Sequence, residues 1–152
     1  MRRPLIAIPM GDPAGIGPEI VLGAAADERI HREARLLAVG GAAVLARALR
    51  YPGAPEIGLH RIASPEEGDY RPGLLNLIDL GVMAEDFVPG RVDARCGRAA
   101  YAYIEKAIRL AMAGQADAVA TPPINKESLR AAGVPYIGHT EIFAALTGTP
   151  DP

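Results

Sequence analysis

The sequence has few of the features that disulfide-built, membrane-spanning or nucleic-acid-binding proteins need. Among 152 residues there is one cysteine and no tryptophan, and 16 Lys and Arg face 18 Asp and Glu. A single cysteine cannot form an internal disulfide, and the near-balanced charge gives no basic surface for nucleic acid. No apolar run approaches the roughly 18 residues that span a bilayer. We therefore predict a cytoplasmic protein with neither nucleic acid nor membrane as a partner.

What the sequence does contain is an alternation of short apolar runs with helical patterns. Hydrophobic residues make up 49% and charged residues 22%, as in ordinary globular proteins. Runs that alternate in this way predict an α/β fold with a mostly parallel central sheet. The predicted strands are 4–9, 35–40, 74–80 and 117–123, and the predicted helices are 18–30, 42–50, 97–113, 126–132 and 139–147.

The segment 97–113 has the clearest helical pattern in the chain. Its apolar side chains recur at helical spacing and predict one buried face. A glutamate and an arginine four residues apart form a predicted ion pair on another face. The apolar set is Tyr101, Ile104, Ile108, Ala111 and Met112, and the pair is Glu105 and Arg109.

The loop after the first predicted strand, with the sequence GDPAGIGPE at 11–19, is rich in glycine and proline. Gly15 and Gly17 fit the first two positions of a dinucleotide-binding fingerprint, but Ile20 stands at the third. A P-loop is also excluded, because no Gly-Lys-Ser/Thr follows. Two interpretations remain: a tight structural turn, or an active-site loop of a different dehydrogenase architecture that includes Gly11 and Asp12.

Cys96 and two of the three histidines carry little functional signal. Cys96 stands at a predicted helix start, where the helix dipole favours a lower thiol pKa, but no histidine neighbours it in sequence. We expect a packed, inert thiol. His31 and His60 lie among polar residues and are predicted at the surface. The three histidines have no ligand spacing, so we expect no metal site within this chain.

Two positions near the end of the chain are stronger candidates. His139 and Thr140 stand at a predicted helix start, where free N–H groups and the helix dipole bind anions. Lys126 follows the carboxyl end of a predicted strand, the usual ligand edge of an open α/β sheet. The alternatives are helix capping for His139 and Thr140 and a solvated surface lysine for Lys126.

Three segments together resemble the 4-hydroxythreonine-4-phosphate dehydrogenase family of pyridoxal phosphate biosynthesis. They are MGDPAGIGPEI at 10–20, GRAAYAYIEKAI at 97–108 and TPPINKESLRAAGVPYIGHTEIFAALTG at 121–148. The family fold is similar to that of isocitrate and isopropylmalate dehydrogenases, an α/β/α sandwich without the usual dinucleotide fingerprint. The resemblance implies that the loop at 11–17 lines the cleft of such a fold.

The family oxidises a phosphorylated hydroxy acid, with hydride passing to NAD or NADP and a divalent metal (Zn, Mg or Co) bound by three histidines. By this resemblance His139 and Thr140 contact the substrate, with Lys126 as a further candidate. The family is homodimeric and about twice this length, and its metal histidines lie beyond the point where this chain ends. We therefore expect an incomplete fold, with 1–122 in a first domain and 123–152 beginning a second, from a truncated or split gene or a partial protein.

The expected substrate is 4-hydroxythreonine 4-phosphate, which the reaction oxidises and decarboxylates. Threonate or erythronate 4-phosphate is the alternative, because GDPAGIGPE and PINKE do not separate these substrates. We expect the chain alone to be inactive. A non-catalytic remnant, or a small-molecule binding module, is the remaining alternative.

Overall fold

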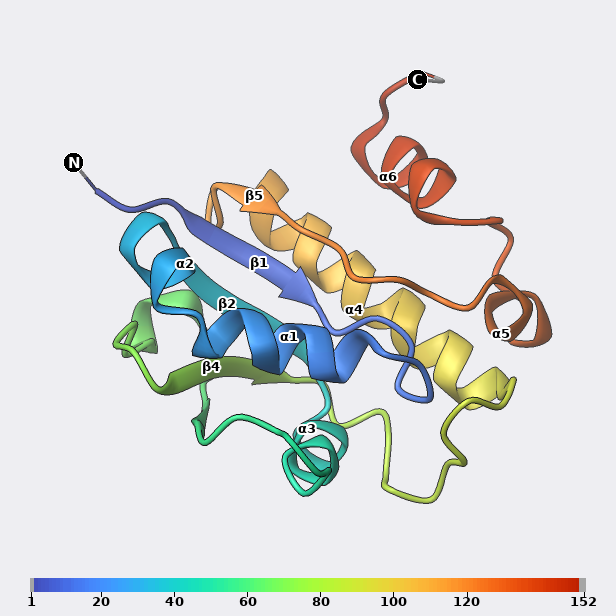
Figure 1. Ribbon diagram of the computed structural model, residues 1–152. Coiled ribbons are helices and arrows are strands. Elements are labelled where there is room, and N and C mark those ends of the chain that lie inside the picture. Colours follow the sequence, from blue (N-terminus) through green and yellow to red (C-terminus); the bar gives the residue numbers. More distant parts are fainter. Residues whose placement is uncertain (1, 151–152) are drawn as a thin grey trace.

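The computed structural model describes residues 2–150, in which five parallel strands form a single sheet (Figure 1). The strands lie in the order β3-β4-β2-β1-β5, and each neighbouring pair is parallel. The predicted α/β class and parallel sheet are therefore confirmed. The strands are β1 (Leu5–Pro9), β2 (Arg35–Gly40), β3 (Gly58–Arg61), β4 (Leu74–Asp79) and β5 (Ala118–Val119).

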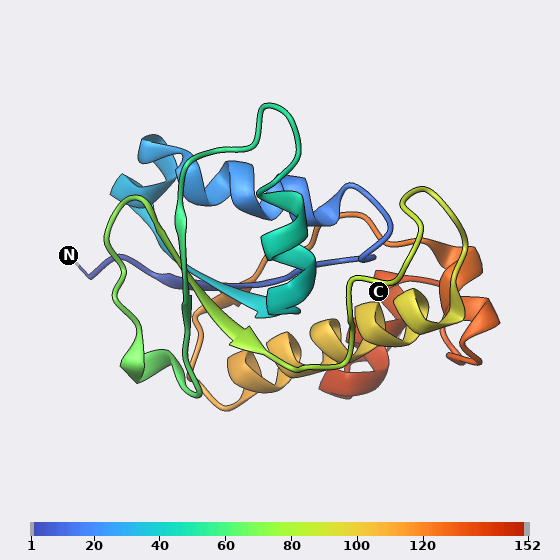
Figure 2. The same cartoon turned by 90° about the horizontal axis from the view of Figure 1, so that it is seen from below.

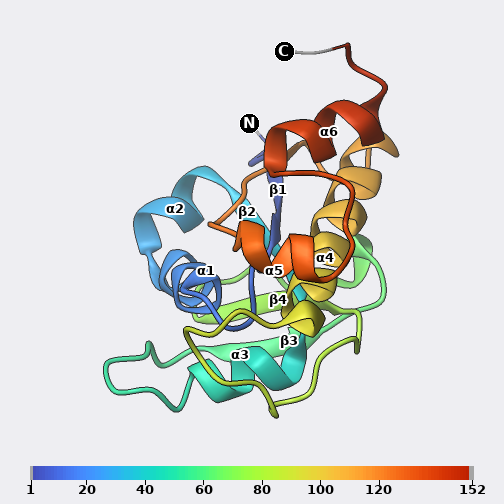
Figure 3. The ribbon, with the colours of Figure 1, turned by 90° about the vertical axis from the view of Figure 1, so that its right-hand side faces the viewer.

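Helices cover both faces of the sheet. Figure 2 shows α1, α2 and α3 on one face and α4 on the other. Helices α5 and α6 pack on α4 from outside and do not cover the sheet directly (Figure 3). The helices are α1 (Gly17–Ala26), α2 (Glu28–Glu33), α3 (Ala42–Ala48), α4 (Ala94–Met112), α5 (Lys126–Ala131) and α6 (His139–Thr147), and a short 3₁₀ helix spans Pro65–Glu67.

The central strands are buried on both faces, which explains why they appear in the sequence as continuous apolar runs. Ala7 of β1, Leu37 of β2 and Leu77 of β4 are each fully buried. Their register is fixed by pairing, with Ala7 opposite Leu37 and Leu77 opposite Ala38. Because β1 lies between β2 and the edge strand β5, the loop that follows it leaves the sheet next to the carboxyl end of β5.

Helix α4 is buried on two faces, where one was predicted. Tyr103 and Ala107 belong to the main core beneath the sheet, and Ile104 and Ile108 belong to a second cluster with Leu129 and Ile142. The predicted face is therefore correct at Ile104 and Ile108. It is wrong at Met112, which is 63% exposed because it lies on the last turn, beyond α5 and α6.

The ends of several elements differ from the prediction. The helix predicted over 18–30 is two helices, because Asp27 adopts an extended conformation and its carboxylate accepts the Arg29 N–H at 2.8 Å, which begins α2. Helix α4 begins at Ala94, not at 97, because Asp93 caps it in the same way. Strand β3 was not predicted.

The strand predicted over 117–123 pairs only at Ala118–Val119. Proline has no N–H to donate, so Pro122 and Pro123 cannot extend the ladder. The helices predicted over 126–132 and 139–147 are confirmed: Asn125 caps α5, and Gly148, with a φ of 66°, ends α6. Within residues 2–150 we find no helix with the length and apolar character needed to cross a bilayer.

Candidate functional site

The carboxyl ends of β1 and β5 lie side by side, but the chain leaves them in opposite directions. β1 leads into α1 on one face of the sheet, and β5 leads into α5 beside α4 on the other (Figure 3). Ligands of open parallel sheets bind at such a switch point, outside the carboxyl ends of the strands. The candidate site is therefore framed by the β1–α1 loop and the β5–α5 connection.

The β1–α1 loop needs glycine for its own backbone packing. Gly11 has a φ of 79°, and a Cβ at this position would stand 2.7 Å from the carbonyl oxygen of Pro123. A Cβ at Gly17 would overlap the carbonyl oxygen of Met10. The loop thus closes on itself and on the β5–α5 connection, and these glycines do not open a cradle for a pyrophosphate. This agrees with the failed dinucleotide fingerprint.

Asp12 is buried beneath this loop, with an exposed fraction of 2%. Its Oδ1 accepts the Ala14 N–H at 2.7 Å, while its Oδ2 has no hydrogen-bond partner among the described residues. Burial raises the pKa of the Asp12 carboxyl, and the nearby charge of Asp93 adds to this, against the lowering effect of the Ala14 N–H. Asp12 therefore stabilises the conformation of the loop through the Ala14 N–H, and its carboxylate is buried.

The β5–α5 connection forms the other side of the site. Asn125 accepts the Ser128 N–H at 3.0 Å, which fixes the start of α5 and the place of Lys126 in its first turn. A depression of about 410 Å³ lies between this connection and the β1–α1 loop. The residues that line it are Asp12, Gly15, Ile16, Pro123, Ile124, Asn125, Lys126 and Glu127. The structure thus brings Lys126 together with the predicted cleft loop.

Ser128 is a buried residue of this region that the sequence analysis did not single out. It is fully buried, and its Oγ accepts the Asp93 N–H at 3.3 Å, so it joins the start of α5 to the start of α4. A serine in the first turn of a short helix is ordinarily solvated or a cap. For that reason no local sequence signal marks Ser128 as buried.

Lys126 also lies beside the start of α6. Its Cε is 3.5 Å from the position that a Cβ on Gly138 would occupy. Gly138 is the N-cap of α6, and its N–H donates to Glu141 Oε2 at 2.7 Å. No carboxylate in the described chain forms an ion pair with Lys126. The Lys126 side chain and the Glu141 carboxylate therefore both lie at the start of α6, a place where negative charge is favoured.

His139 and Thr140 occupy the first two positions of α6. The N-cap is Gly138, so capping by the side chain of His139 is not what the structure shows. Thr140 is exposed, whereas the Nε2 of His139 is buried and has no hydrogen-bond partner within residues 2–150. Burial lowers the pKa of His139, which favours a neutral imidazole near pH 7.

The other two histidines lie away from this edge. His31 was predicted at the surface, and this prediction is wrong: it is 5% exposed, and its Nε2 lies 2.7 Å from the Ala25 carbonyl oxygen. His60 is half-buried, and its ring pairs with Asn76 Oδ1 at 3.0 Å. No group of three His, Cys, Asp or Glu in the described part of the chain is placed to hold a metal ion.

Cys96 is buried in the first turn of α4. Burial raises the pKa of the thiol to about 11, and the negative charges of Asp12 and Asp93 act in the same direction. These effects on the thiol pKa are therefore larger than the decrease that the helix dipole was expected to cause. A thiol in this state is a weak nucleophile, as the packed and inert interpretation predicts.

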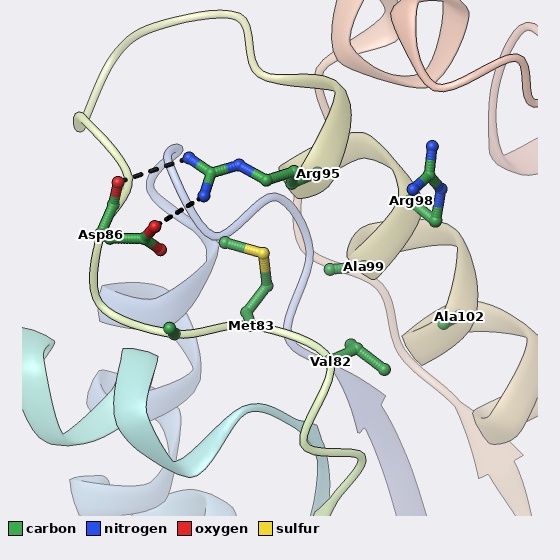
Figure 4. A pocket seen from close by; sticks show the side chains of 8 residues that line it. Val82, Met83, Asp86, Arg95, Arg98, Ala99 and Ala102 are labelled. Atoms are coloured by element: carbon green, nitrogen blue, oxygen red, sulfur yellow. Dashed lines mark hydrogen bonds and ion pairs between the residues drawn. The ribbon is translucent and has the colours of Figure 1, made fainter.

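A second depression, of about 330 Å³, lies between the β4–α4 loop and α4 (Figure 4). Met83 and Ala99 line it, and Asp86 pairs with Arg95 at 2.8 Å beside it, while Arg98 lies further along the helix. This depression contains neither the cleft loop nor any predicted substrate contact. We therefore keep the candidate site at the β1–β5 switch point.

These features define an α/β protein whose candidate ligand site lies at a switch point of a parallel sheet and is built without a dinucleotide fingerprint. A family model described as "Pyridoxal phosphate biosynthetic protein PdxA" matches residues 32–152. The chain therefore belongs to the PdxA family.

Individual relatives agree with this assignment. A protein of Symbiobacterium thermophilum, provisionally named D-threonate 4-phosphate dehydrogenase, is 50% identical over 99% of this chain and 45% of its own length. The crystal structure of a 4-hydroxythreonine-4-phosphate dehydrogenase from Burkholderia phymatum superposes with a TM-score of 0.93 at 42% identity, over 97% of this chain and 44% of that one. The chain thus spans under half the length of these relatives.

A second solved structure is less similar. It is a terephthalate 1,2-cis-dihydrodiol dehydrogenase from Burkholderia xenovorans LB400, with a TM-score of 0.74 and 33% identity over 99% of this chain and 42% of that one. All three relatives carry the name of a dehydrogenase. The substrates in these three names differ from one another.

Proposed function

We propose that this chain is the substrate-binding part of an NAD- or NADP-dependent dehydrogenase that oxidises a secondary alcohol on a four-carbon hydroxy acid 4-phosphate. The observation that carries the proposal is the position of Lys126. It lines the depression at the β1–β5 switch point and also lies beside Gly138, which directly precedes His139 and Thr140. A substrate with a carboxylate and a phosphate suits an ammonium group beside the first turn of a helix.

Each of these residues has a distinct task in the proposal. Lys126 supplies a positive charge next to Gly138. Thr140 is exposed on the first turn of α6 and can donate a hydroxyl hydrogen bond to the substrate. His139, neutral at pH 7 because its pKa is lowered, offers either an N–H donor or a nitrogen lone pair. Together they orient the substrate before any chemical step.

The metal and the nicotinamide cofactor that the family resemblance implies are not accounted for by the described residues. No cluster of potential metal ligands is present in residues 2–150, and the β1–α1 loop is closed against its own backbone. When bound, NAD or NADP supplies the hydride acceptor. We assign to this chain only the binding and orientation of the substrate.

Two substrates fit the proposal. The resemblance in the motifs favours 4-hydroxythreonine 4-phosphate. The provisional names of relatives that are 50% and 48% identical favour D-threonate 4-phosphate instead. The carbon next to the carboxylate carries an amino group in 4-hydroxythreonine 4-phosphate and a hydroxyl group in threonate 4-phosphate. Both acids have a carboxylate and a phosphate, so Lys126 and α6 do not distinguish between them.

A chimera tests the proposal. This chain is joined to the part of the Symbiobacterium relative that it does not span, and NADH or NADPH formation is measured with both phosphorylated acids and with unphosphorylated D-threonate. The expected result is turnover of one phosphorylated acid by the chimera and none by the chain alone. A chimera that folds, binds the cofactor and turns over neither acid contradicts the proposal, as does equal activity on unphosphorylated D-threonate.

A further inference from the structure

The β4–α4 loop, residues 80–93, crosses the carboxyl edge of the sheet without regular secondary structure. Irregular connections of this length within a compact domain are uncommon and often functional. Met83 and Phe87 anchor the loop, with exposed fractions of 8% and 4%, whereas Val82 and Val88 face solvent. The path of the loop is thus fixed at a few buried points.

Arg47 of α3 makes three contacts with this loop. Its Nη1 donates to the carbonyl oxygens of Glu85 at 2.8 Å and of Phe87 at 2.9 Å. Its guanidinium carbon also lies 4.6 Å from the centre of the Phe87 ring. A planar guanidinium can bind carbonyls at its edge while stacking on an aromatic face, and an ammonium group cannot reproduce this combination.

The same stretch of loop is joined to the candidate site. The Gly90 N–H donates to the carbonyl oxygen of Ala14 at 2.7 Å, and Ala14 directly precedes Gly15. Phe87 and Gly15 also line one small cavity of about 40 Å³. A continuous set of contacts therefore runs from Arg47 through Phe87 and Gly90 to the cleft loop.

We propose that Arg47 is a positioning residue for the ligand site: it holds Phe87–Gly90 against Ala14 and so fixes the backbone of Ala14 and Gly15. Arg47 does not line the depression at the switch point and touches no group proposed to contact substrate. Its effect reaches the site through the β4–α4 loop. Only the identity of the ligand rests on the proposed function.

Two other arginines also bind the loop, but through exposed ion pairs. Arg50 pairs with Glu85 at 2.6 Å, and these side chains are 60% and 47% exposed. Arg95 pairs with Asp86 at 2.8 Å, with 51% and 66% exposure (Figure 4). Exposed pairs contribute little because water and salt screen them. Arg50 lies three residues after Arg47 and binds the same loop only through an exposed ion pair, so it provides a matched control.

The test uses amide hydrogen exchange and NMR on the 152-residue chain without ligand. In Arg47→Met we expect the Gly90 amide to exchange about tenfold faster or more, because a hydrogen-bonded charged anchor is lost. The amide resonance of Gly15 should shift as well, while the exchange of Ile104 and Ile108 stays unchanged. Arg50→Met should leave Gly90 and Gly15 as in wild type, and Arg47→Lys should lie between wild type and Arg47→Met.

Three results would overturn the proposal: an unchanged Gly90 amide in Arg47→Met, an equal effect of Arg50→Met, or a shift at Gly90 that never reaches Gly15. Uniformly faster exchange that includes Ile104 would also count against it, because it would indicate a general loss of stability. None of these outcomes depends on a substrate. In the active chimera, Arg47→Met should in addition lower kcat/KM and Arg47→Lys should restore part of it, and a failure of the chimera alone would bear on the proposed function only.

Discussion

Gly97 of α4 lies directly against the backbone of Ser128 in α5. A Cβ at position 97 would overlap the Ser128 carbonyl oxygen and stand 2.7 Å from the amide nitrogen of Leu129. Only glycine permits this approach, and it brings the Ser128 side chain within reach of Asp93. The position of α5, and with it Lys126, therefore depends on the absence of a side chain at Gly97.

Gly97→Ala should lower the free energy of unfolding by about 1–3 kcal/mol, because a backbone contact must separate to admit one methyl group. Gly23→Ala is the matched control: Gly23 lies within α1, and a Cβ there meets nothing within 4 Å. The control should stabilise the chain by about 0.5–1 kcal/mol, since glycine is unfavourable inside a helix. Urea unfolding of both variants checks this prediction, and equal effects would contradict it.

Asp12→Asn should stabilise the chain at pH 7. Burial raises the pKa of Asp12 above its ordinary value of 3.8, so the folded state disfavours the carboxylate, and its stability falls as the pH rises through that raised pKa. An asparagine keeps an oxygen for the Ala14 N–H and removes the charge. The gain should be largest at pH 7 and vanish below about pH 3.8, where both states are protonated.

The check on this prediction is urea unfolding of Asp12→Asn and of wild type between pH 3 and pH 8. Asp12→Ala serves as the comparison, because it removes the charge and also the acceptor of the Ala14 N–H. It should be less stable than Asp12→Asn at every pH. A loss of stability in Asp12→Asn at pH 7 would show that the ionised carboxylate is needed.

His139→Ala in the active chimera should lower kcat/KM about 10- to 150-fold, the equivalent of a hydrogen bond to a charged group. The metal content should not change, because His139 is not assigned as a ligand. His60→Ala is the control, since His60 lies on β3, away from the switch point. A normal kcat/KM combined with a lowered Tm would assign His139 a structural role only.

His31→Ala should lower the free energy of unfolding by about 1–3 kcal/mol, because it removes a buried ring and leaves the Ala25 carbonyl without its partner. Arg32→Ala, at an exposed neighbouring position, should change the stability by less than about 0.5 kcal/mol. Thermal or urea unfolding of the two variants makes the comparison. Equal stabilities would restore the surface assignment of His31.

The sequence predicted the fold well wherever local chemistry decides the structure. The predicted ranges of α5 and α6 agree with the structure because Asn125 and Gly148 act on the backbone next to them. His31 was misjudged because its burial depends on α2 packing against the end of α1. The predicted domain boundary at 122/123 stays a prediction.

The candidate site was predicted only in its parts. Lys126, His139 and the cleft loop were each named from local motifs, but their proximity depends on two close backbone approaches, at Gly11 and at Gly97. A glycine that accepts a neighbouring backbone looks in sequence like any other glycine. The roles of Arg47 and Ser128 were missed for a similar reason, because their partners are distant in sequence.

The two buried faces of α4 also bear on how the chain is made. The face with Ile104 and Ile108 is covered by Leu129 and Ile142, which are translated later. Translation at about 5–20 residues per second takes about 2–6 seconds to pass from the end of α4 to Ile142, and this apolar face stays uncovered for at least that time. Nascent α4 therefore presents an apolar face to chaperones during this interval, and a pause in translation before Ile142 would lengthen it.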